Sequence, residues 1–182
     1  MADPRVARSR RAILDAAVEL LVEHGFAGAT IEAISARSGA AKTTIYRQWP
    51  DKHAVLRAAV ESIVPPAAPS DTGSLRGDLV AFAHDLDGIL HTAPTSALIP
   101  GLIDAAERDP GLAAVLADFT AQRRRPVHEA VARAVGRGEI ERHEFVADLF
   151  LGPLFYRRLL SREPLDDAFI ERVVDAALAG TR

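Results

Sequence analysis

The sequence predicts an all-α fold of about nine helices. The composition is 48% hydrophobic, dominated by Leu, Ala, Val and Ile, and only 5% aromatic, which favours helices. Apolar residues recur at three- and four-residue spacing along most of the chain, whereas the period-two alternation of half-buried strands is scarce. At 182 residues the chain is long enough to bury a core. We therefore expect helices packed on helices, without a β-sheet.

Composition also excludes several classes of site. The chain contains no cysteine, which excludes disulfides, thiolate zinc sites and cysteine nucleophiles. The polar, basic start MADPRVARSRR lacks the apolar segment of a signal peptide, and no later run approaches the roughly 20 apolar residues of a membrane span. We expect a cytoplasmic protein that has no membrane partner and needs no cofactor.

The N-terminal part predicts three helices in quick succession. Residues 9–24 keep their apolar side chains on one helical face and stop at Gly25. Thr30 can cap a second helix, which Gly39 ends because glycine adopts left-handed backbone at little cost. The third helix, KTTIYRQ, follows after residues 39–41. A tight glycine-containing turn between two short helices is the helix-turn-helix arrangement.

A fourth helix, capped by Asp51, continues to the double proline at residues 65–66. The stretch VPPAAPSDTGS is the joint between an N-terminal module and a larger helical part. Proline at position 126 should kink one of the later helices, because it removes a backbone hydrogen bond. Those later helices are predicted over residues 79–90, 97–107, 110–135, 144–160 and 166–179.

The helix after the turn has the side chains of a DNA reader. A recognition helix fits the major groove with small and polar side chains outward, while an apolar side chain anchors it. Ile45 is that anchor. Threonine, tyrosine and arginine can each reach a phosphate or a base edge, although each could equally belong to a solvated helix face. The outward residues are Lys42, Thr43, Thr44, Tyr46 and Arg47.

Charge is divided unevenly along the chain. Through Lys52 there are eight Lys and Arg against six Asp and Glu, and afterwards fourteen against nineteen. A sequence pI near 6.1 argues against indiscriminate polyanion binding, so contact with nucleic acid must come from a local surface. Both lysines of the chain, Lys42 and Lys52, fall in this region. A compact ammonium at the N-terminus of the fourth helix suits a phosphate, which gives Lys52 a role, whereas the role of Lys42 stays open.

Residues 12–60 resemble the DNA-binding domain of the tetracycline-repressor (TetR) family of transcriptional regulators. The resemblance covers EHGF at the end of the first helix, Thr30, ISARSG, TTIYRQW and the lysine that opens the fourth helix. It implies that Thr43, Thr44 and Tyr46 lie on the recognition helix, and that Tyr46 and Lys52 mainly hold phosphate. The residues that we assign to DNA are Thr30, Lys42, Thr43, Thr44, Tyr46, Arg47 and Lys52.

Two details of this region stay open. The family often has a serine just before the recognition helix, where this chain has Ala41, so Thr43 could supply the cap or the helix could start one residue later. The N-terminal arm resembles arms that reach phosphate or the minor groove, and it could otherwise be a frayed tail. Its basic residues are Arg5, Arg8, Arg10 and Arg11.

From about residue 75 the resemblance is weaker but continues in RAVGRGEI, GPLFYRRLL and EPLDDAFIERVVDAAL. It implies a helical domain that binds a small-molecule effector and forms a homodimer through its last two helices, which could otherwise be ordinary core. A two-fold dimer reads two half-sites, hence a palindromic operator on double-stranded DNA. The candidate effector residues are Phe82, Leu86, Leu98, Ile103, Leu116, Phe119 and Phe150. The candidate dimer residues are Leu149, Tyr156, Leu160, Phe169 and Val173.

We therefore predict a ligand-responsive transcriptional repressor without catalytic chemistry. Residues 1–52 form a helix-turn-helix DNA-binding domain with an N-terminal arm, and residues 53–182 form the ligand-binding and dimerisation domain. The alternative is a small helical enzyme or carrier that uses His84, Asp87 and His91, which share one helical face and could gather a metal. The run at residues 123–125, three arginines, could bind an acidic ligand or form a solvated face.

Overall fold

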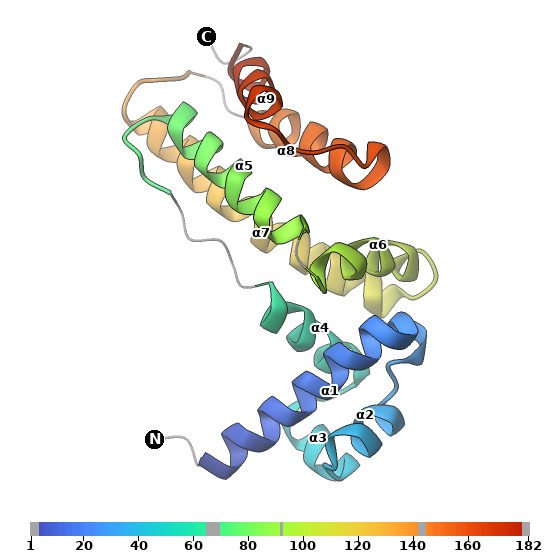
Figure 1. Cartoon of the computed structure of the whole chain (residues 1–182). Helices are drawn as coiled ribbons and strands as arrows, with labels where there is room; N and C mark the ends of the chain where they lie inside the picture. The colour runs from blue at the N-terminus through green and yellow to red at the C-terminus, as the bar shows by residue number, and fades with distance from the viewer. Residues whose placement is uncertain (1–3, 65–69, 92, 142–144, 180–182) are drawn as a thin grey trace. The chain divides into compact units, whose positions relative to one another are not determined.

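The computed structural model describes residues 4–64, 70–91, 93–141 and 145–179, shown as a series of helices in Figure 1. Every regular element among these residues is helical, which confirms the predicted all-α class. A π-helix, Tyr156–Ser161, follows the eighth α-helix. The α-helices are α1 Pro4–Gly28, α2 Ile31–Ser38, α3 Lys42–Gln48, α4 Lys52–Ile63, α5 Leu75–His91, α6 Thr95–Ala106, α7 Pro110–Gly136, α8 Val146–Phe155 and α9 Asp167–Ala179.

The chain folds into two compact units that do not follow the order of the sequence. One combines Met1–Pro65 with Ala93–Phe119, and the other combines Pro66–Thr92 with Thr120–Arg182. The first unit holds α1 to α4, α6 and the start of α7, and the second holds α5, the rest of α7, α8 and α9. The domain boundary after residue 52 stays a prediction.

Helix α1 is longer at both ends than the sequence predicts. It begins at Pro4, because proline lacks only an N–H that the first helical turn does not use. At Gly25, the predicted stop, φ is 66° and helical geometry is interrupted, but the chain makes one more turn to Gly28. The basic residues predicted to form a separate arm are therefore part of the first turns of α1, namely Arg5, Arg8, Arg10 and Arg11.

The first unit has its core where the predicted apolar faces meet. Helix α1 contacts α2, α4 and α6, and α2 contacts α3. The side chains on these faces are removed from water, which supplies most of the driving force for packing such short helices. The buried core residues of the first four helices are Ile13, Ala16, Ala17, Leu20, Leu21, Phe26, Ile31, Ile34, Ile45, Val55, Leu56, Ala59 and Val60.

A buried carboxylate joins α5 to α7 in the second unit. Asp78 is 2% exposed, and its Oδ1 accepts hydrogen bonds from the Thr72 backbone N–H at 2.7 Å and hydroxyl at 2.9 Å. Its Oδ2 accepts a third from Arg133 Nη2 at 2.9 Å. Burial alone would raise the pKa of Asp78, but the bonds from Thr72 and Arg133 outweigh burial and lower it. The carboxylate is therefore ionised and fully paired at neutral pH.

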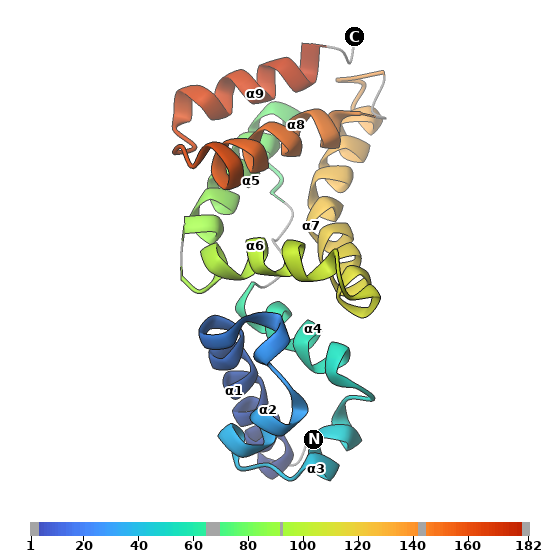
Figure 2. The same cartoon turned by 90° about the vertical axis from the view of Figure 1, so that its right-hand side faces the viewer.

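Prolines affect the long helices of the second unit differently. Pro126 lies inside α7, which continues past it to Gly136, and the kink at this position stays a prediction. Pro153 lies inside α8, and the chain then changes to the π-helix. The predicted helix 144–160 is therefore two elements, and its expected start at Glu144 lies outside the described residues. Helices α8 and α9 lie side by side (Figure 2).

Candidate nucleic-acid interface

The turn between α2 and α3 fixes how these two short helices meet (Figures 1 and 2). Gly39 ends α2 in the left-handed conformation at φ 70°, which a glycine adopts without steric cost. The Ser35 hydroxyl then donates to the Ala40 carbonyl at 2.7 Å, and the Ala40 N–H donates to Ser38 Oγ at 3.2 Å. Hydrogen bonds from α2 therefore hold the turn in place, and the predicted helix-turn-helix is confirmed.

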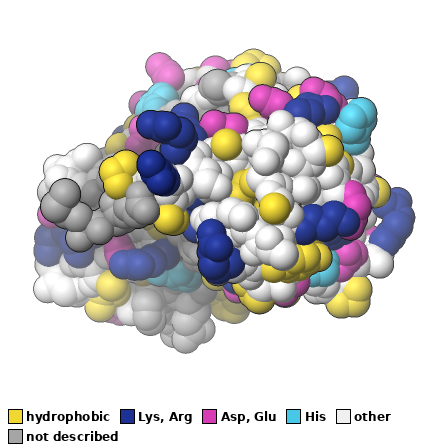
Figure 3. All heavy atoms as spheres, turned by 90° about the horizontal axis from the view of Figure 1, so that it is seen from below, with side chains coloured by type: hydrophobic (Ala, Val, Ile, Leu, Met, Phe, Trp, Pro, Cys, Tyr) yellow, Lys and Arg dark blue, Asp and Glu magenta, His cyan; other side chains and the backbone are white. Residues whose placement is uncertain are grey.

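Helix α3 turns one apolar side chain inward and its polar side chains outward. Ile45 is the buried residue of α3, and Trp49 directly after the helix is 5% exposed. Thr44 is half-buried. The exposed residues, all predicted to contact DNA, are Lys42, Thr43, Tyr46 and Arg47. Figure 3, which views the molecule from below, shows separate basic side chains among acidic and uncharged ones instead of one continuous basic patch.

The start of α3 settles how this helix is capped. It begins at Lys42, and Ala41 occupies the N-cap position without a side-chain hydrogen bond. The Ala41 carbonyl instead accepts from the N–H groups of Thr44 at 2.8 Å and Ile45 at 3.2 Å. Thr43 therefore does not supply the cap, and the later start is also wrong.

Thr30 and Lys52 lie at the beginnings of two other helices. Thr30 caps α2, since its Oγ1 accepts from the Ala33 N–H at 3.1 Å. Lys52 is the first residue of α4 and is half-buried. Its neighbour Asp51 caps the same helix by accepting from the Ala54 N–H at 2.9 Å. The structure thus gives Thr30 a capping role, and contact of Thr30 or Lys52 with DNA stays a prediction.

Replacing Asp51 by alanine is expected to lower the free energy of unfolding by about 1 kcal/mol, because the N–H of Ala54 loses its cap. Asp51→Asn is the matched control, since asparagine caps about as well as aspartate and should change stability little. Urea unfolding followed by circular dichroism measures both variants. Equal destabilisation by alanine and asparagine would show that the cap is unimportant.

Lys42 has a partner that sequence reasoning missed. Its Nζ lies 2.5 Å from Glu32 Oε1, so an ion pair connects the first turns of α2 and α3. Both side chains are at least half exposed. The two residues are ten positions apart on different helices, so no spacing rule for a single helix could reveal the pair.

Two further contacts within the first unit hold its helices together. The Arg10 guanidinium of α1 lies 4.7 Å from the centre of the Trp49 ring, which fixes the chain just after α3. Arg37 of α2 bonds Glu23 of α1 at 2.7 Å and Glu19 at 3.3 Å. Glu23 and then Glu19 raise the pKa of Arg37 by accepting these bonds. Both arginines therefore connect α1 to a neighbouring element of this unit.

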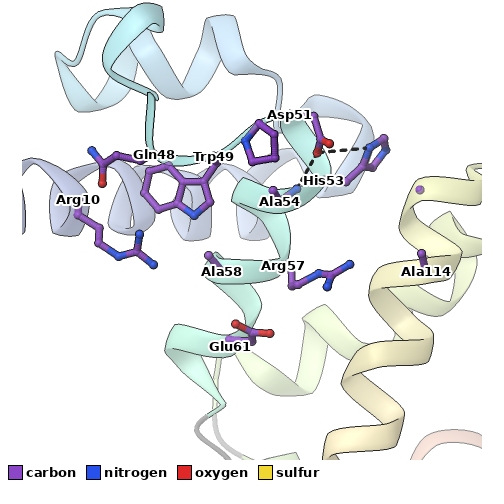
Figure 4. A pocket seen from close by; sticks show the side chains of 12 residues that line it. Arg10, Gln48, Trp49, Asp51, His53, Ala54, Arg57, Ala58, Glu61 and Ala114 are labelled. Carbon is purple, nitrogen blue, oxygen red and sulfur yellow. Dashed lines mark hydrogen bonds and ion pairs between the residues drawn. The ribbon is translucent and has the colours of Figure 1, made fainter. Parts of the chain in front are cut away.

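A polar groove of about 670 Å³ lies beside α4 in the same unit (Figure 4). Its charged side chains are already engaged: His53 Nε2 lies 3.1 Å from the Asp109 carboxylate, and Arg57 pairs with Asp118. The hydrogen bond from His53 is the main cause of a lowered pKa for Asp109. Residues that line the groove include Arg10, Gln48, Trp49, Asp51, His53, Ala54, Arg57, Ala58, Glu61, Gly111 and Ala114. These contacts tie α4 to the start of α7.

The candidate effector residues are divided between the two compact units. Phe82 and Phe150 meet edge-to-face in the second unit with ring centres 5.9 Å apart, and Leu86 of that unit is also buried. In the first unit, Ile103 is 41% exposed and Leu116 is half-buried, whereas Leu98 and Phe119 are buried. Contact of any of these seven residues with an effector stays a prediction.

The candidate dimer residues differ in exposure. Leu149, Tyr156 and Leu160 are 52%, 61% and 71% exposed, and Phe145, which directly precedes α8, is 67% exposed. Phe169 is half-buried beneath the Arg157 guanidinium, 4.3 Å from its ring centre, and Val173 is buried. Large apolar side chains are thus exposed at intervals of four or seven residues from the start of α8 to the π-helix, the spacing of one helical face. We call Phe145, Leu149, Tyr156 and Leu160 the α8 row.

Several residues of the two alternative sites pair with neighbouring side chains. His91 pairs with Asp87 at 2.8 Å, and no group of three His, Asp or Glu side chains among the described residues could hold a metal ion. Of the three consecutive arginines, Arg124 and Arg125 pair with Asp148 and Glu129, while the side chain of Arg123 is buried. Within the described part of the chain, no helix has the length and apolar character to cross a membrane.

Known proteins resemble the chain over most of its length. The HTH-type transcriptional regulator YdeS of Bacillus subtilis is 33% identical over 184 aligned positions, covering 98% of this chain and 92% of that protein. The DNA-binding transcriptional repressor TetR of Mycobacteroides abscessus is 34% identical over 174 positions, covering 92% of this chain and 90% of that protein. The crystal structure of the TetR family transcription regulator SCO0332 matches with a TM-score of 0.71 at 33% identity, covering 96% of this chain and 98% of that one.

Both parts of the chain also match described families. Residues 13–59 match "Bacterial regulatory proteins, tetR family", and they contain the whole helix-turn-helix. Residues 69–177 match "Tetracyclin repressor-like, C-terminal domain". With the helix-turn-helix geometry and the relatives above, these matches show that the chain belongs to the TetR family of transcriptional regulators.

Proposed function

We propose that the protein is a homodimeric repressor that reads a palindromic operator with α3 and releases it when a small-molecule effector binds. The observation that carries the proposal is the division of α3 into one buried anchor, Ile45, and an exposed polar face. Its side chains suit DNA: Thr43 can touch a base edge, Tyr46 a phosphate, and Arg47 either. The protein would act in the cytoplasm, where operator DNA is accessible.

The α8 row supports the homodimer. Soluble monomers rarely leave several large apolar side chains exposed side by side, and a second copy of the same surface would cover them. The symmetry of such a dimer would place two copies of α3 on half-sites about 34 Å, or a multiple of it, apart. Recognition of a palindromic operator therefore requires the dimer.

Induction would follow from a shift between two forms of the dimer. An effector that prefers the form whose two α3 helices do not match the half-site spacing lowers operator affinity by its differential affinity for the two forms. The candidate effector residues are all apolar, so we propose an effector that is largely apolar. Because binding to the folded protein raises its apparent stability, a screen of compounds by melting temperature would reveal it.

The proposed contacts of α3 and α4 predict two different changes in DNA binding. Replacing Tyr46 by phenylalanine and Lys52 by glutamine removes phosphate contacts, so the affinity should fall for DNA of every sequence. Loss of the lysine contact should also reduce the slope of log affinity against log salt concentration by about one unit. Replacing Thr43 or Thr44 by valine should instead change discrimination at single base pairs by about 1–3 kcal/mol. Gel shifts on an operator recovered by genome-wide selection measure both.

The wild-type protein tests the function itself. It should protect a palindrome, and recovery of no preferred sequence by selection would contradict the proposal. Unchanged affinity in the Tyr46 and Lys52 variant, together with unchanged preference in both threonine variants, would refute the residue assignments while leaving the family membership intact.

A further inference from the structure

The ion pair between Glu32 and Lys42 joins the first turns of α2 and α3, the two helices of the helix-turn-helix. Glu32 is in the first turn of α2, two residues after the cap Thr30, and Lys42 is the first residue of α3. Their charged atoms are 2.5 Å apart, and the side chains are 67% and 50% exposed. A carboxylate thus holds a lysine that is predicted to contact DNA.

The positions of the two charges explain why they pair. An N-cap residue recruits a glutamate at the third helical position to close a capping box, but Glu32 is at the second position and Ala33 at the third. Its carboxylate therefore does not close a capping box and can pair with a cation. Lys42 places an ammonium at the positive end of the α3 dipole, which is unfavourable unless an anion lies near. Its bond to Glu32 is the main cause of a lowered pKa for that carboxyl.

Phosphate and Glu32 would compete for the same ammonium. A carboxylate and a phosphate are both oxygen anions that accept a charge-assisted hydrogen bond from Nζ. For Lys42 to contact the backbone of DNA, it must either leave Glu32 or share its protons with it. Glu32 itself carries a negative charge and is repelled by the backbone. Lys52, the other lysine, has no carboxylate partner among the described residues, so this competition distinguishes Lys42.

We propose that Glu32 is a built-in competitor of the DNA backbone for Lys42, which weakens binding to duplex DNA of every sequence. Because phosphates carry no sequence information, the ratio of operator to unrelated DNA affinity stays the same while both affinities fall. The proposal rests on the proposed function, since it requires that α3 approach DNA. With Glu32 in place, the affinity for duplex DNA is lower than the basic residues alone would give.

A double-mutant cycle separates this competition from simple charge repulsion. Anisotropy titrations with the full-length protein use a labelled operator duplex and an unrelated duplex of equal length at several salt concentrations. Glu32→Gln should raise both affinities about 3- to 10-fold at low salt and steepen the salt slope by up to about one unit. In the Lys42→Met background the same change should raise affinity less than half as much.

The matched control is Glu19→Gln, which removes one exposed carboxylate from the same unit while Arg37 keeps its bond to Glu23. It should leave affinity within about 2-fold. Equal gains from Glu32→Gln with and without Lys42, or an equal gain from Glu19→Gln, would overturn the proposal. Because the cycle is also measured on unrelated duplex, its result is independent of the operator; absence of any operator preference in the wild type would instead overturn the proposed function.

Discussion

Replacing Leu149 and Leu160 together by glutamate is expected to make the protein monomeric and to weaken operator binding by about 100-fold or more. Both side chains belong to the α8 row and are more than half exposed, so the substitutions should leave the fold of the subunit intact. In a dimer they would bury unpaired carboxylates, which is strongly unfavourable. A monomer reads one half-site and loses the contacts of the second.

Light scattering after size-exclusion chromatography reports the mass, and anisotropy with the operator duplex reports the affinity. Val135→Glu is the matched control, because Val135 of α7 is a 40% exposed apolar residue of the same unit outside the α8 row. It should remain dimeric with wild-type affinity. A dimeric Leu149 and Leu160 variant that still binds the operator tightly would exclude the α8 row as the interface.

Replacing Asp78 by alanine is expected to lower the free energy of unfolding by about 3 kcal/mol at pH 7. The substitution removes the acceptor of bonds from Thr72 and Arg133 and leaves the partly buried guanidinium without this carboxylate. Urea unfolding measures the loss. The control is Asp175→Ala, which breaks an exposed pair with Arg76 and should cost about 0.5 kcal/mol or less.

The stability lost in the Asp78→Ala variant should depend on pH. Because the folded-state pKa of Asp78 is lowered, its contribution is complete above the unfolded pKa of about 3.9 and is lost as the pH falls through the folded value. The difference in stability between wild type and Asp78→Ala should therefore be constant from pH 7 to about 5 and shrink below about pH 4. A difference that stays constant down to pH 3 would mean that the charge of Asp78 does not matter.

Features set by a few neighbouring residues could be predicted from the sequence. The caps at Thr30 and Asp51 and the left-handed turn at Gly39 depend on hydrogen bonds or backbone angles within three residues, so residue type was sufficient. The outward face of α3 followed from helical periodicity around Ile45. The start of α1 was missed because tolerance of Pro4 depends on its position in the first turn.

Contacts between helices could not be predicted in the same way. The pairs Glu32 with Lys42 and His53 with Asp109 join residues whose distance depends on how whole helices pack. The change to a π-helix at Tyr156 likewise has no local sequence rule. The exposure of the candidate dimer residues could not be predicted for the same reason, since it depends on helix packing that Val173 is buried and Leu160 exposed.

The single buried anchor of α3 has an evolutionary consequence. Since Ile45 is the residue through which α3 contributes to the core, substitutions at Thr43 or Arg47 change little of the free energy of folding. New operators can therefore be acquired by changing the outer face one residue at a time, without passing through unstable intermediates. The same scaffold can thus serve many different genes, with Ile45 retained and its outer neighbours exchanged.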